Sequence, residues 1–122
     1  MKKILLILFT LSFTLAFSQD TSKVKGFTVF KYENGKISSE GVMRNGKPDG
    51  YWKTYYDIGT LKSEGNRKNF IIDSLWKFYN DNGIISKQIT FVNGIYDGPV
   101  WFYDEKGKLQ EKVKYRNGNL VK

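Results

Sequence analysis

From residue 27 onward, hydrophobic and polar residues alternate along the chain with a period of two. Leu61, Ser63 and Gly65, for example, alternate with longer polar neighbours, and a period of two is typical of β-strands with one face in water. No part of this region sustains an apolar period of 3.6 residues, so the pattern does not favour helices. The sequence therefore predicts an all-β fold.

The alternating pattern recurs every 24 residues, and six sets of equivalent positions share this spacing. These sets are Gly35, Gly59, Gly83 and Gly107; Asn45, Asn69, Asn93 and Asn117; Ile37, Leu61, Ile85 and Leu109; Asp49, Asp73 and Asp97; Tyr55, Tyr79 and Tyr103; Trp52 and Trp76. A fixed period of this length indicates stacked copies of one supersecondary unit. We predict four hairpin units, residues 27–50, 51–74, 75–98 and 99–122, forming an elongated, twisted antiparallel β-meander.

Two kinds of turn separate the predicted strands. A glycine closes the first kind, where a three-residue hairpin loop needs a positive φ; these glycines are Gly35, Gly59, Gly83 and Gly107. The second kind is an Asn-Gly pair, a strong signal for a two-residue hairpin turn, and it begins at Asn45 and at Asn93.

One unit departs from this turn pattern. It has Phe70 after Asn69, and because phenylalanine disfavours the left-handed region we predict that this turn opens into a different loop. The apolar run Phe70, Ile71 and Ile72 then needs a cover, either by folding back on the sheet or by a partner. These three residues are candidate partner-binding residues.

The unit resembles the MORN repeat, on the strength of the segments Tyr32–Gly41, Asn45–Trp52 and Tyr56–Gly65. It is most similar to the bacterial variant found in tandem hairpin arrays, which includes a YwqK-like family labelled as antitoxins. The resemblance implies an elongated antiparallel sheet that serves as an interaction or membrane-proximal module. Ile89 and Val113 depart from the motif, because they replace its glycine.

The N-terminus has the pattern of a signal peptide, with two lysines before an apolar run from Ile4 to Phe17. That run is shorter than the roughly 20 residues of a membrane-spanning helix. We expect cleavage after Ser18, an N-terminal extension over residues 19–26, and export to the periplasm or the medium.

The composition bears on chemistry. The chain has no histidine and no cysteine, which removes imidazole bases, thiol nucleophiles and the usual transition-metal ligands. Asp49, Asp73 and Asp97 recur once per unit, so they are expected to build turns and not a catalytic pair. The loops at Asp81 and Asp104 offer too few oxygens for a calcium site. We therefore predict a protein that is not an enzyme and has no cofactor.

Net charge extends the list of possible partners. The chain carries +8, or +6 without Lys2 and Lys3, which favours acidic partners and also simply favours solubility. The basic residues of Lys108–Arg116 could form a patch for anionic surfaces or protect an edge strand from pairing. The expected partner is a protein or an envelope component, with an anionic surface as an alternative; no nucleic acid is expected.

Aromatic residues occupy both faces of the predicted sheet. Phe30, Phe78 and Phe102 share one face with Trp52 and Trp76, and Tyr55, Tyr79 and Tyr103 lie on the other. The tyrosines either pack against a neighbouring hairpin with their hydroxyls in water, or form a ladder that binds sugars or a partner chain. They are the main candidate partner-binding residues. The function predicted first is a non-enzymatic exported repeat module for protein or envelope interaction; the alternatives are binding of anionic lipid or polysaccharide, and an antitoxin or immunity role.

Overall fold

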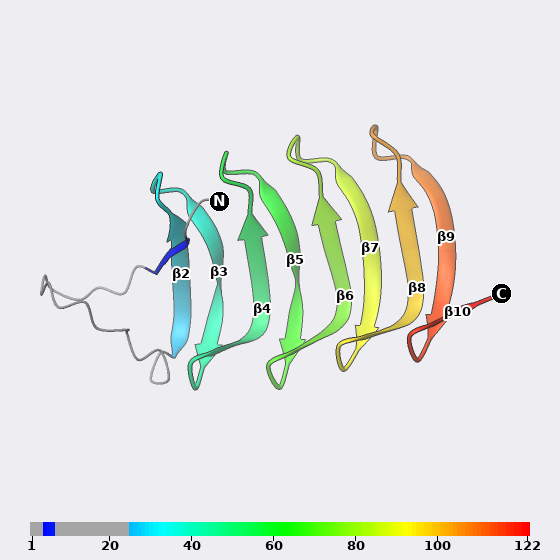
Figure 1. Cartoon of the computed structure of the whole chain (residues 1–122), viewed down its shortest axis with the longest axis horizontal. Helices are drawn as coiled ribbons and strands as arrows, with labels where there is room; N and C mark the ends of the chain where they lie inside the picture. The colour runs from blue at the N-terminus through cyan, green and yellow to red at the C-terminus, as the bar shows by residue number, and fades with distance from the viewer. Residues whose placement is uncertain (1–3, 7–24) are drawn as a thin grey trace, which may run out of the picture.

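The described residues, 4–6 and 25–122 of the computed structural model, form one antiparallel sheet (Figure 1). Each strand pairs with the strands before and after it in the sequence, without crossovers. The strands are β1 (Ile4–Leu6), β2 (Gly26–Tyr32), β3 (Ile37–Arg44), β4 (Lys47–Tyr55), β5 (Leu61–Lys68), β6 (Ile71–Tyr79), β7 (Ile85–Val92), β8 (Ile95–Tyr103), β9 (Leu109–Arg116) and β10 (Asn119–Val121). From β2 onward this is the predicted meander of hairpin repeats, and the all-β prediction is confirmed.

The predicted cleavage site after Ser18 lies outside the described residues, as do most of the leader and of the extension over residues 19–26. The segment β1 lies within the predicted leader and pairs with the outer edge of β2. None of the described segments is a helix long and apolar enough to cross a membrane.

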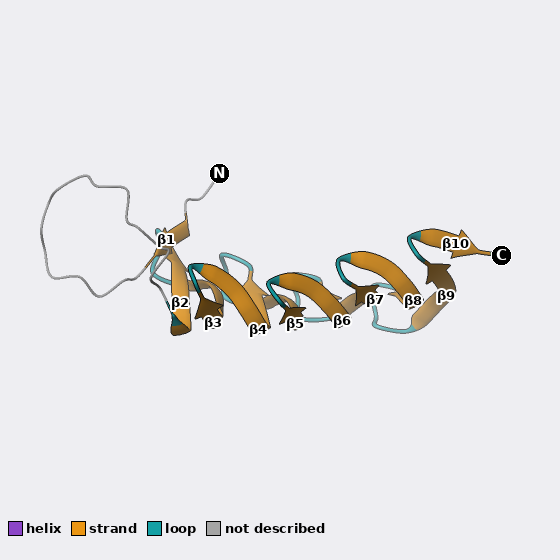
Figure 2. Cartoon of the chain, turned by 90° about the horizontal axis from the view of Figure 1, so that it is seen from below, coloured by secondary structure: helices purple, strands orange, loops and turns teal. Residues whose placement is uncertain are grey.

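Seen from below, the repeat region is a single layer of strands (Figure 2). No other described element covers either face of this layer. Among the residues that the structure describes, six hydrophobic side chains are buried, namely Met43, Trp52, Trp76, Ile89, Phe91 and Val100. The domain therefore buries its apolar residues mainly against neighbouring strands of the same sheet.

The three-residue turns have the predicted conformation. Gly59 has φ 103°, and its N–H donates to the carbonyl oxygen of Tyr56 at 2.9 Å. The same bond closes the turns at Gly35, Gly83 and Gly107, where φ lies between 83° and 87°. The four glycines thus occupy a backbone region that side chains rarely enter.

The prediction for Asn69–Phe70 is wrong. Phe70 adopts φ 71°, and the turn has the two-residue geometry of Asn45–Gly46 and Asn93–Gly94. Two contacts favour this conformation: the Arg44 guanidinium lies 4.5 Å from the centre of the Phe70 ring, and the Phe70 N–H donates to Asp49 Oδ1 at 3.2 Å. The energy of these contacts offsets the backbone strain.

The strands that open the later units start earlier than predicted. β4, β6 and β8 begin at Lys47, Ile71 and Ile95, four residues before the expected unit boundaries at 51, 75 and 99. The aspartates were expected to cap a bend between strands, but the chain there continues as strand through a β-bulge. The residue after each aspartate has a positive φ of 65° to 120°, at Gly50, Ser74 and Gly98. At each of these places two extra residues in the strand therefore replace the turn that was predicted at the aspartate.

Candidate functional site

The two faces of the sheet differ in chemistry. We call the side with Phe30, Trp52, Trp76, Phe78 and Phe102 the aromatic face, and the side with Tyr55, Tyr79 and Tyr103 the tyrosine face. Strand alternation predicts this division, and the structure confirms it, since one shallow groove is lined by the first four of these residues.

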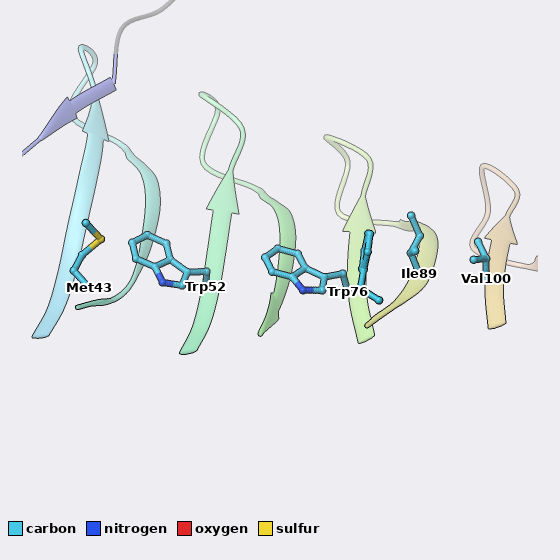
Figure 3. Close-up of a cluster of buried hydrophobic side chains, with 6 residues drawn as sticks. Met43, Trp52, Trp76, Ile89 and Val100 are labelled. Atoms are coloured by element: carbon cyan, nitrogen blue, oxygen red, sulfur yellow. The ribbon is translucent and has the colours of Figure 1, made fainter. Parts of the chain in front are cut away.

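The tryptophans of the aromatic face lie flat on glycines of the preceding strand. A Cβ atom built on Gly41 would lie 2.5 Å from Trp52 Cδ2, and one on Gly65 would overlap Trp76 in the same way. Both indole N–H groups donate to backbone carbonyls at 2.9 Å, Trp52 to Val42 and Trp76 to Asn66. Figure 3 shows the two indoles side by side in one row with Met43, Ile89 and Val100. These glycines are therefore required by close packing.

A second row of side chains crosses the aromatic face next to the indoles. Paired positions on successive strands place Phe30, Ser39, Thr54, Ser63 and Phe78 in register. Thr54 occupies the position where the other units have phenylalanine. Three small hydroxyl residues thus interrupt the phenylalanine row over three adjacent strands.

This interruption forms a groove of about 520 Å³. Its lining is mostly apolar and comprises Phe30, Ser39, Pro48, Trp52, Thr54, Ser63, Arg67, Ile72, Trp76 and Phe78. At its floor the Thr54 and Ser63 hydroxyl oxygens are hydrogen bonded to each other at 2.6 Å. An apolar groove with a few polar groups is the usual form of a binding site.

The groove has a positively charged margin. The Arg67 guanidinium lies 5.8 Å from the centre of the Trp76 ring and donates to the Phe70 carbonyl oxygen at 3.2 Å. Arg67 is the one charged residue in the lining, so no carboxylate opposes it there. The site therefore favours a ligand that has negative charge beside an apolar group.

On the tyrosine face the tyrosine hydroxyls are bound within the sheet. Tyr55 donates to Glu40, Tyr79 donates to Glu64 Oε2 at 2.6 Å, and Tyr103 accepts from Gln88 Nε2 at 2.9 Å. The expectation that packed tyrosines keep their hydroxyls in water is thus wrong, whereas the binding of a partner by these tyrosines stays a prediction. Each bond joins positions 15 residues apart, so the same pair recurs in successive units.

Glu64 is the centre of this network. It accepts a hydrogen bond from Tyr51 at 2.5 Å as well as from Tyr79, and Lys53 and Lys77 lie opposite it on the two adjacent strands. Partial burial disfavours its charge, but the two tyrosine hydrogen bonds and the positive charges of Lys53 and Lys77 together outweigh burial and hold the pKa of Glu64 below its usual value. Burial, together with Glu64, raises the pKa of Tyr51 to about 12. The network therefore holds an ionised glutamate between neutral tyrosines.

The candidate residues of the atypical turn divide between several environments. Phe70 lies against Arg44, Ile71 is exposed, and Ile72 lines the groove. The structure thus brings Ile72 to the same surface as Trp52 and Trp76 and separates it from Tyr55, Tyr79 and Tyr103. Whether these residues bind a partner stays a prediction.

The recurring aspartates connect the units. Asp49 Oδ1 accepts the Phe70 N–H, and Asp73 Oδ2 accepts the Asn93 N–H at 2.9 Å. The Phe70 bond, assisted by Arg44, lowers the pKa of Asp49. Within the described part of the chain no group of three acidic residues is placed to hold a metal ion.

The sequence profile of the MORN repeat variant family matches residues 48–69, 72–93 and 96–117. The chain belongs to this family. The matched segments begin 24 residues apart, and each covers one hairpin of the MORN repeat sheet, from β4 to β9. Comparison of the sequence with curated proteins found no significant match. MORN repeats are generally associated with protein or membrane interactions.

The groove was not predicted from the sequence, although its signal was visible. Thr54 interrupts a set of positions that otherwise holds Phe30, Phe78 and Phe102. The groove therefore arises at a departure from the repeat within the phenylalanine row, and not at the tyrosine row or at the atypical turn alone.

Proposed function

We propose that the protein is a non-enzymatic, exported interaction module that binds another protein or an envelope component through the aromatic face of its sheet. The observation that carries this proposal is the groove over Thr54, which lies on a sheet face that no other described element covers and has an apolar lining with one cationic side chain. The absence of histidine and cysteine from the sequence supports a binding role over catalysis.

The proposed export rests on the N-terminal sequence alone. Two lysines precede an apolar segment, and small residues precede the expected cleavage site after Ser18. N-terminal sequencing of the protein recovered outside the cytoplasm should begin at Gln19. Recovery of the uncleaved chain from the cytoplasm alone would contradict export.

The binding role is tested by affinity capture from a native envelope extract with the purified protein as bait. We expect a specific protein to be retained at both low and physiological salt, because ions screen interactions between charges and weaken apolar contacts little. The control bait is an unrelated β-sheet protein of equal net charge. Retention of the same proteins by both baits would contradict the proposal.

Anionic surfaces are a second candidate, favoured by the cluster of basic residues near the C-terminus. Lys112 and Lys114 border a shallow depression with Pro99, Leu120 and Val121, which combines positive and apolar side chains at the end of the sheet. This candidate predicts binding to anionic vesicles that weakens steeply between low and physiological salt. Binding that does not depend on salt would exclude it.

A further inference from the structure

We propose that the groove over Thr54 binds an aromatic side chain of a partner protein, presented on a segment that carries carboxylates beside that ring. The inference rests on the proposed role as a protein-binding module and specifies its ligand. It starts from an asymmetry within the repeat: one position of the phenylalanine row holds threonine.

The sheet itself shows how a ring packs at this kind of position. The Phe30 ring lies 6.1 Å from the ring of Trp52, which belongs to the next unit, and the Phe78 ring lies 6.5 Å from Trp76 of its own unit. A ring placed over Thr54 would contact two indoles. Its contact with Trp76 would match the contact of Phe30 with Trp52. Its contact with Trp52 would match the contact of Phe78 with Trp76. An incoming aromatic side chain thus completes two pairs whose counterparts already exist in the molecule.

The length of the gap favours a peptide segment over a single ring. Phe30 and Phe78 lie on β2 and β6, four strand spacings apart, which is about 19 Å at 4.8 Å per spacing. One ring fills only part of this length. The residues on either side of the aromatic side chain can therefore lie in the same groove.

Charge indicates which flanking residues fit. Arg67 is the charged group of the lining, and among the described residues it donates one hydrogen bond, to the Phe70 carbonyl oxygen. A carboxylate next to the ring would meet this guanidinium without opposition from an acidic residue of the groove.

The floor disfavours a sugar ligand. A bound sugar needs hydrogen-bond partners for several hydroxyl groups, but the Thr54 and Ser63 hydroxyls already bond to each other. The rest of the lining is mainly apolar. A protein segment with one ring and an adjacent carboxylate needs fewer polar contacts with the groove than a sugar does.

The three tryptophans provide the test. Trp52 and Trp76 line the groove. Trp101 lies on the tyrosine face, where it pairs with Gln88 and Lys112 in the row that contains Glu64. Their indole N–H resonances are followed by NMR while the peptide Gly-Asp-Phe-Asp-Gly is added. We expect saturable shifts at Trp52 and Trp76 and none at Trp101. The peptides Gly-Lys-Phe-Lys-Gly and Gly-Asp-Ala-Asp-Gly should bind at least about tenfold more weakly, because each lacks one of the two groups that the groove recognises.

Thr54→Phe fills the groove with the ring found in the other units and should abolish the shifts while preserving the fold. Thr54→Leu is a second blocking variant, and Gln110→Phe adds the same ring at an exposed position as the matched control. Unchanged shifts in folded Thr54→Phe or Thr54→Leu protein would overturn the proposal. So would shifts caused by anionic vesicles and not by the peptide, which would indicate a lipid ligand. A partner captured equally well by Thr54→Phe and wild type would refute the groove as its site, although the protein would still act as a binding module through another surface.

Discussion

At the scale of single residues, the packing of the sheet depends on the combined volume of two side chains that lie opposite each other on neighbouring strands. Glycine lies under tryptophan at Gly65 and Trp76, whereas the equivalent positions one unit later hold Ile89 and Val100, which are both buried. In the first pair the small Gly65 accompanies the large Trp76. In the second pair both residues, Ile89 and Val100, are of intermediate size. The departure of Ile89 from the repeat motif is therefore compensated by its neighbour Val100.

This compensation predicts a non-additive pair of substitutions. Gly65→Ile should destabilise the domain by about 1–3 kcal/mol or more, because the added side chain overlaps the indole of Trp76. Adding Trp76→Val should restore part of that loss, with a coupling energy of about 1 kcal/mol or more. Urea unfolding of both single variants and the double variant measures the coupling. A double variant less stable than Gly65→Ile alone would refute the claim that the sizes of the two side chains compensate each other.

Glu64 predicts how stability depends on pH. Its pKa in the folded protein lies below the usual value of 4.5, so its contribution to stability is present above that value and is lost as pH falls through the folded pKa. Glu64→Gln should lower the melting temperature at neutral pH and flatten its dependence on acid. The matched control is Glu105→Gln in an exposed turn. Equal acid dependence of the Glu64→Gln protein and the wild type would contradict the network.

At the scale of elements, the turns determine the register of the hairpins. Gly59, with φ 103°, is representative of the glycines with positive φ that close the four three-residue turns. Gly59→Val should destabilise the protein by at least about 1 kcal/mol, because a branched side chain is strained at positive φ. Thermal unfolding followed by circular dichroism measures the loss, with Ile58→Val in the same exposed turn as control. An unchanged melting temperature for Gly59→Val would show that the turn tolerates a side chain.

Strands and three-residue turns could be predicted from the sequence because their determinants are local. Alternation, glycine at a fixed offset and a 24-residue period each act within one hairpin. The turn at Phe70 could not be predicted in this way, because Arg44 and Asp49 of the preceding unit stabilise its conformation. The bulges at Gly50, Ser74 and Gly98 were missed for a related reason: an aspartate followed by a residue with positive φ also fits a turn.

At the scale of the whole molecule, stability and binding draw on different residues. Positions that repeat build the sheet: glycines form turns, aspartates connect units, and tyrosines hydrogen bond to a glutamate or a glutamine of the neighbouring strand. The groove appears where the repeat is interrupted at Thr54, so it has one copy in a chain of four units. The candidate site was therefore less predictable than the fold, since it depends on the side chains of three adjacent units.

The most direct test of the account is affinity capture by the wild-type protein and by Thr54→Phe, with Gln110→Phe as the matched control. The account predicts that the wild type and Gln110→Phe retain the same partner protein and that folded Thr54→Phe loses it. Equal retention by all three baits would contradict the central claim that the aromatic face binds its partner at Thr54.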